Sequence, residues 1–145
     1  VIITINDKIK ITPFLVPHRD EYSETVGFNI SGPNKSVLFI PDIDKWDLWK
    51  KDIVAEIERN DHLFLDATFF DGTELPGRDM NQIPHPLVVE SMQLFANLSI
   101  EEKQKIHFIH FNHTNPLYQP GSNASKTLIN AGLRVAKQGQ IFNLY

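Results

Sequence analysis

The sequence predicts a single α/β domain in which helices cover a mainly apolar sheet. Its 145 residues are enough for one domain with a real hydrophobic core. Strand-like runs come first, and strands then alternate with helical patterns, which is the order expected when helices pack on a sheet. No repeat, low-complexity tract or linker divides the chain.

The composition is that of an ordinary globular protein, and it excludes several classes of site. Hydrophobic residues make up 41% of the chain and charged residues 22%, with a formal net charge of -4. That charge, and the lack of a basic stripe interleaved with aromatic residues, disfavours a nucleic-acid partner. The chain has no cysteine, so any metal must be bound by His, Asp or Glu. No apolar run approaches the roughly 20 residues that span a bilayer, and no signal segment opens the chain, so we expect a cytoplasmic protein.

Strand patterns fill the beginning of the chain, and a helical pattern follows them. Asn6-Asp7 predicts a tight hairpin turn, and the sequence SGPNK predicts a second turn. The predicted strands span residues 2–5, 8–16, 25–30 and 36–40. A stripe of apolar residues at helical spacing predicts a helix over residues 46–59.

Strand and helix patterns alternate in the rest of the chain. The run HLFLDATFF (62–70) predicts a buried strand, whereas residues 71–86 contain two Gly and three Pro and predict a long irregular excursion, commonly a functional one. Further helices are predicted over residues 87–98 and 122–131, and further strands over residues 105–111, 134–137 and 141–144. Ser99 is predicted to cap a short helical turn, and Gly132 to end the last helix.

Three potential metal ligands follow predicted strands: His18, Asp42 and His110. The carboxyl ends of strands are where α/β folds usually place their chemistry. Imidazole and carboxylate are the ligands that zinc, manganese or iron accept when no thiolate is available. A lone histidine at a strand end is more often structural, but three ligands at equivalent positions favour a metal site.

The neighbouring histidines leave alternatives to this assignment. His113 competes with His110 as the ligand; we favour His110 because it is still on the predicted strand. His113 is then expected to brace the following turn together with the nearby Asn and Thr side chains. His107 is expected to pack on the opposite face of the strand, and His62 to lie on the surface.

Asp66 and His85 are polar residues in unusual surroundings. Asp66 interrupts an apolar run, where a carboxylate is costly to bury unless it is paired or hydrogen-bonded. Either it accepts backbone N–H groups at the start of the next loop, or its pKa is tuned so that it orients or protonates a group at the site. His85 lies between two prolines that fix its direction, and is either a proton donor to a leaving group or a rigid loop residue.

Five stretches of the chain together resemble a known family. VPHRDEYSETVGFNI, SVLFIPDID, FLDATFF, IPHP and FIHFNHTNP, in this order between about Val16 and Pro116, resemble the metallo-β-lactamase-fold hydrolases. Within that superfamily they look like the proteins of the pyrroloquinoline quinone biosynthesis protein B type. The resemblance implies an αββα sandwich with a dinuclear metal site, zinc or else manganese or iron, at one edge of its two sheets.

The resemblance also assigns roles to individual residues. His18, Asp42 and His110 match the positions of metal ligands, with Asp42 bridging the two ions and preferred over Asp44 because it follows the strand more closely. DATF and the later IPHP look like the Glu-Ala-Thr-Phe and following His of the related tRNA 3′-processing enzymes. Asp66 and His85 would therefore assist proton transfer.

One signature of the family is absent. The motif His-x-His-x-Asp-His occurs nowhere in the chain, so residues 1–145 look like a single, incomplete domain: the carboxy-terminal half of the sandwich. We expect the sheet face left open to pair with the missing amino-terminal half, or with another copy in a homo-oligomer.

Several functions remain open at this level. The leading hypothesis is metal-dependent hydrolysis of a small-molecule substrate. The quinone-biosynthesis relatives imply oxidative chemistry instead, and the tRNA-processing relatives imply a phosphodiesterase. A catalytically inactive metal-binding or structural module is the remaining alternative.

Overall fold

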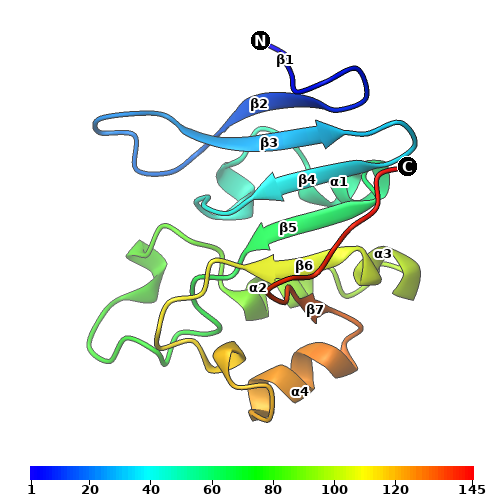
Figure 1. Cartoon of the computed structure of the whole chain (residues 1–145). Coiled ribbons are helices and arrows are strands. Elements are labelled where there is room, and N and C mark those ends of the chain that lie inside the picture. Colours follow the sequence, from blue (N-terminus) through cyan, green and yellow to red (C-terminus); the bar gives the residue numbers. More distant parts are fainter.

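A computed structural model describes all residues, 1–145, and contains one seven-stranded sheet with the strand order β1-β2-β3-β4-β5-β6-β7 (Figure 1). The strands from β1 to β4 pair antiparallel, and those from β4 to β7 pair parallel. Their bounds are Ile3–Thr4 (β1), Lys10–Val16 (β2), Thr25–Ser31 (β3), Ser36–Ile40 (β4), His62–Asp66 (β5), Ile106–Ile109 (β6) and Arg134–Val135 (β7). The predicted α/β class is confirmed.

Four α-helices and three short 3-10 turns connect the strands. The helices are α1 (Ile53–Arg59), α2 (Val88–Leu94), α3 (Ile100–Gln104) and α4 (Asn123–Asn130). The turns are η1 (Trp46–Leu48), η2 (Met80–Gln82) and η3 (Pro116–Tyr118). As predicted, the Ser99 side chain caps α3 by accepting from the Glu102 N–H (3.2 Å), and Gly132 follows α4 with a φ of 85° that favours glycine. No helix has the length and apolar character needed to cross a bilayer.

The predicted helix over residues 46–59 is wrong in one respect: it is two separate elements. After η1 the backbone becomes extended at Trp49, and α1 begins only after Asp52. The cause is local, because the Asp52 side chain accepts from the Val54 N–H (2.9 Å) and so starts a new helix.

Other predicted bounds are also too long. β5 ends at Asp66 rather than residue 70, since the Asp66 carboxylate accepts the Thr68 N–H and turns the chain. α2 ends at Leu94, and Phe95 turns inward to become fully buried. Residues 141–145 form no strand at all.

One face of the sheet forms the main core with the helices. Its fully buried side chains include Leu38, Ile40, Leu63, Leu65, Ile106 and Phe108 from the strands. The helices and their flanks contribute Ile57, Val88, Phe95, Leu128 and Leu133. α1 lies behind the sheet in Figure 1, against this face. Because three neighbouring strands are anchored here, the loops that leave their carboxyl ends start from a rigid base.

The other face is only partly covered. Phe28, Phe39 and Phe64 lie in register across β3, β4 and β5, are half-buried, and follow one another at ring-centroid distances of 6.5 and 6.3 Å. The carboxy-terminal segment crosses in front of this face in Figure 1, and the Phe142 ring meets Phe64 edge-on at 4.9 Å.

The two histidines of this face differ from each other. His107 packs as predicted: it is buried, and its ring stacks on Phe64 at 5.5 Å. His62 was predicted to lie on the surface, but it is half-buried because Phe142 covers its ring at 5.0 Å.

Candidate metal centre

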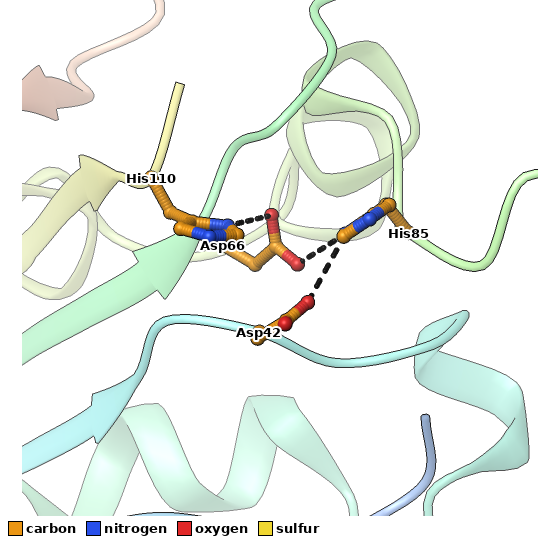
Figure 2. Close-up of side chains that lie close together, drawn as sticks. All are labelled: Asp42, Asp66, His85 and His110. Carbon is orange, nitrogen blue, oxygen red and sulfur yellow. Dashed lines mark hydrogen bonds and ion pairs between the residues drawn. The ribbon is translucent and has the colours of Figure 1, made fainter. Parts of the chain in front are cut away.

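The ends of three parallel strands bring acidic and imidazole side chains to one edge of the sheet. Asp42 lies two residues beyond β4, Asp66 is the last residue of β5, and His110 directly follows β6. These strands are neighbours in the sheet, so their carboxyl ends open at the same edge. His85 reaches the same place from the long excursion before α2, as Figure 2 shows.

The structure brings all five predicted site residues together. Asp42, Asp66, His85 and His110 each offer one potential ligand atom, and these four atoms lie within 4.8 Å of one another. His18, which follows β2, joins the group through Asp42: its Nε2 lies 3.2 Å from Asp42 Oδ1.

The competing histidine lies outside this cluster. His113 is exposed in the turn after His110. The turn itself is held by the Asn112 side chain, which donates to Thr114 Oγ1 (2.7 Å), and by the Asn115 side chain, which donates to the Ala67 carbonyl (2.6 Å).

Asp42 has an oxygen that suits a bound cation. Its Oδ1 is buried and accepts no hydrogen bond, although His18 Nε2 lies 3.2 Å away and His85 Nδ1 3.5 Å away. A buried, unpaired carboxylate oxygen is costly, and a divalent cation between it and the imidazoles would remove that cost. The mixture of carboxylate oxygen and imidazole nitrogen fits zinc, manganese or iron.

Asp66 is fully buried and hydrogen-bonded on both oxygens. Its Oδ1 accepts from the Thr68 N–H (2.8 Å) and the Thr68 hydroxyl (2.7 Å), and its Oδ2 accepts from the Ile43 N–H (3.1 Å). Burial alone would raise the pKa of Asp66, but the neighbouring imidazole rings of His110 and His85 and the hydrogen bonds from Thr68 hold that pKa below its usual value. The carboxyl is therefore ionised at neutral pH, and it accepts backbone N–H groups as well.

His85 is fixed between Asp66 and α2. Its Nδ1 lies 2.8 Å from Asp66 Oδ2, and the backbone of its loop is tied by the His85 N–H to the Ile83 carbonyl (2.9 Å). The start of α2 is in turn joined to the loop that contains Asp42. Trp46 Nε1 donates to Ser91 Oγ (2.8 Å), and an ion pair links Lys45 to Glu90 (2.8 Å). These links connect the loop of Asp42 to α2, which begins three residues after His85.

His110 has an unusual backbone. We expected it on the strand, but β6 ends at Ile109 and His110 has a φ of 65°, in the left-handed region that residues with a Cβ rarely adopt. The conformation turns the chain away from the sheet. The Asp66 carboxylate, whose Oδ1 lies 3.8 Å from His110 Nδ1, raises the pKa of His110; burial opposes this, and the charge of Asp42 adds to it.

Thr68 is a site residue that the sequence analysis missed. Its Oγ1 lies 3.1 Å from His85 Nδ1 and 3.0 Å from His110 Nδ1, in addition to its hydrogen bond to Asp66. The signal was present in the sequence, because a Thr two residues after a buried Asp is well placed to donate to that carboxylate through a local turn.

The chain is similar to known proteins in both sequence and fold. The family model described as "Beta-lactamase superfamily domain" matches residues 2–111. Two curated relatives are both described as coenzyme PQQ synthesis protein B. The protein from Ruegeria pomeroyi is 27% identical over 124 residues, which is 80% of this chain and 40% of that protein. The protein from Gluconobacter oxydans is 29% identical over 133 residues, 83% of this chain and 40% of that protein.

A solved structure shares the fold. It is the crystal structure of Zn²⁺-bound PqqB from Methylobacterium extorquens, with a TM-score of 0.77 and 21% sequence identity. The match covers 99% of this chain and 53% of the PqqB chain. This chain thus spans about two fifths of the length of the curated relatives and about half of the solved one.

Proposed function

Given that the chain belongs to the beta-lactamase superfamily, we propose that it provides the metal-binding edge of a metal-dependent hydrolase, with His18, Asp42 and His110 as ligands. The observation behind this proposal is the buried Asp42 Oδ1, which accepts no hydrogen bond although two imidazole rings lie beside it. The Zn²⁺-bound structural relative supports zinc as the ion. With the remaining ligands of a complete sandwich, the site would hold two ions.

The residues around the ligands are suited to moving a proton. Asp66, ionised and buried, accepts from His85 Nδ1 and holds the ring in place, so that His85 Nε2 can accept a proton from water and then deliver it to a leaving group. When bound, the metal supplies Lewis-acid activation of water and of the substrate oxygen. The contacts of Trp46 and Lys45 with α2 tie the loop of the ligand Asp42 to the helix that follows His85.

We propose a small molecule as the substrate. The curated relatives are named for coenzyme PQQ synthesis, which supports a precursor of a quinone coenzyme rather than a macromolecule. The net charge of -4 gives no attraction for a polyanion, which disfavours the phosphodiesterase alternative.

We also propose that residues 1–145 form one half of an αββα sandwich. Two observations support this: the chain matches only 40% of each curated relative, and one face of its sheet has half-buried phenylalanines. The second sheet would pack on the face of Phe28, Phe39 and Phe64.

Calorimetric titration with Zn²⁺ tests the ligand set. We expect His18→Ala, Asp42→Ala and His110→Ala each to weaken zinc binding by more than about tenfold. The matched control is His113→Ala, which removes a nearby but exposed imidazole and should leave affinity unchanged. Unchanged zinc affinity in the His18 and Asp42 variants would refute the assignment. Zinc-dependent cleavage of chromogenic ester and amide substrates, lost in the same variants, would separate a hydrolase from an inactive metal-binding module.

A further inference from the structure

We propose that Thr68 is a positioning residue that sets the tautomers of His85 and His110, so that both rings present Nε2 to the metal and the substrate. The inference rests on the proposed function for the use of those Nε2 atoms, but the tautomers themselves follow from the hydrogen bonds. Thr68 Oγ1 is the one atom that lies within 3.1 Å of Asp66 Oδ1, His85 Nδ1 and His110 Nδ1 together.

The direction of these hydrogen bonds is fixed at Asp66. An ionised carboxylate is an acceptor only, with about four lone-pair positions. Thr68 N–H, Thr68 O–H, Ile43 N–H and His85 Nδ1 approach the two oxygens at 2.7 to 3.1 Å, which occupies all four positions. Asp66 therefore has no lone pair free for a cation and acts by orienting its neighbours.

The Thr68 hydroxyl has one hydrogen, and it donates this hydrogen to Asp66 Oδ1. Oγ1 can then only accept, and the two atoms in reach are the Nδ1 atoms of His85 and His110. His110 Nδ1 must therefore donate to Oγ1, so the hydrogen of the His110 ring is on Nδ1. The His85 ring also has its hydrogen on Nδ1, because that atom must donate to Asp66 Oδ2. A neutral imidazole with hydrogen on Nδ1 has its free lone pair on Nε2. That is the atom left to bind a metal at His110 and, at His85, to accept a proton that the ring can then pass to a leaving group.

A different arrangement is compatible with the distances alone. The potential ligand atoms of Asp42, Asp66, His85 and His110 lie within 4.8 Å of one another, so the Nδ1 atoms could themselves bind an ion together with Asp66. In that case neither Nδ1 has a hydrogen, and the Thr68 hydroxyl points toward a ring nitrogen. The two arrangements predict opposite tautomers in the metal-free protein.

The experiment is long-range ¹H–¹⁵N correlation of the histidine rings in the ¹⁵N-labelled, metal-free full chain above the pH at which the rings are charged. We expect the Nδ1–H pattern for His85 and His110, whereas exposed His113 should show the Nε2–H form that free histidine prefers. An Nε2–H pattern for His110 in the unsubstituted protein would overturn the proposal, whatever the variants do.

Two substitutions separate the hydroxyl from the rest of the side chain. Thr68→Val keeps the shape and the backbone N–H bond to Asp66 but removes the hydroxyl; Thr68→Ser restores it. We expect Thr68→Val to move His110 toward the Nε2–H form and to weaken Zn²⁺ affinity about 10- to 100-fold, the usual range for outer-shell partners, with Thr68→Ser close to the unsubstituted protein. Unchanged tautomer and affinity in a folded Thr68→Val protein would also contradict the proposal.

A failure of the proposed metal-binding function can be told apart from a failure of the Thr68 proposal. If the unsubstituted protein binds no zinc, the metal proposal fails, yet the ring spectra still decide whether Thr68 sets the tautomers. If Thr68→Val does not fold, the spectra of the unsubstituted protein and of Thr68→Ser give the answer by themselves.

Discussion

His110 combines a ligand role with a backbone that its residue type disfavours. Its φ of 65° brings Cβ close to the neighbouring carbonyl, at a cost of about 1–2 kcal/mol. We expect His110→Gly to be about 1 kcal/mol more stable than His110→Ala, because both lose the imidazole but only glycine relieves the strain. Denaturant unfolding of the two variants measures the difference. At His113, where φ is negative, glycine should give no such advantage over alanine; equal stability of the two His110 variants would show that position 110 is unstrained.

The charge state of His110 predicts how the stability of the protein depends on pH. The stabilising effect of the charged ring is lost as the pH rises, whereas the stabilising effect of a bound metal grows. The nearby Asp66 carboxylate raises the pKa of His110 above its ordinary 6.5, so the metal-free protein gains stability from the charged ring. That gain is complete below pH 6.5 and is lost as the pH rises through the raised pKa. A metal requires the neutral ring, so zinc should stabilise the protein more at pH 8 than at pH 6.

The measurement is the free energy of unfolding against pH in chelator and in zinc. His62 and His107 have pKa values lowered chiefly by burial, which adds a dependence of the opposite sign. His110→Ala keeps both of these residues, so the difference between the two proteins isolates His110. Parallel pH profiles for the metal-free proteins would contradict the prediction.

At the scale of secondary-structure elements, the pairing of β2 with β3 depends on a glycine. Gly27 lies opposite Phe14, and a Cβ there would come within 2.6 Å of the Phe14 ring and 3.2 Å of Ile40. Phe14 cannot easily move, since its ring stacks on Trp49 at 5.7 Å. We expect Gly27→Ala to lower the unfolding free energy by about 1–3 kcal/mol, measured by denaturant unfolding. Gly121→Ala, where nothing lies within 4 Å, is the control and should have little effect; equal effects of the two would argue against overpacking at position 27.

The sequence predicts elements well where one periodicity dominates and poorly where a side chain redirects the backbone. The strands of the sheet and the caps at Ser99 and Gly132 could be read from local pattern. The division of the 46–59 helix depends on the Asp52 cap, and the early end of β5 on the hydrogen bond from Thr68 to Asp66. Both are polar contacts that a hydrophobic pattern does not contain.

The candidate site could likewise be predicted only in part from the sequence. Placing ligands at strand ends identified His18, Asp42 and His110, because the carboxyl ends of parallel strands share an edge, and their unusual surroundings identified Asp66 and His85. Their mutual geometry required the fold: His110 leaves its strand, and Thr68 becomes central only when the excursion brings His85 beside Asp66. The ligand roles themselves stay predictions until metal binding is measured.

At the scale of the whole molecule, the sheet is covered unequally on its two faces. Helices bury one face over β4, β5 and β6, whereas on the other face the carboxy-terminal segment covers β5 and β6 and leaves β2 and β3 more open. Leu15 of β2 belongs to the open face, since it lies in register with Val26, two residues from Phe28, and it is 65% exposed. An apolar surface of this kind promotes association when its covering layer is absent.

We therefore expect the 145-residue chain to self-associate through this face, with an apparent mass that rises with concentration in sedimentation analysis. Leu15→Lys should shift the association to markedly higher concentration, because a buried lysine in the contact would have no partner. Leu48→Lys is the matched control: Leu48 is similarly exposed, at 58%, but it lies in η1 beside the tryptophans of the helix-covered side. If the Leu48 variant dissociates as readily as the Leu15 variant, a general charge effect explains the result and the open face is not the contact. If Leu15→Lys alone dissociates, the face of β2 and β3 is the surface that a second sheet would cover in a complete sandwich.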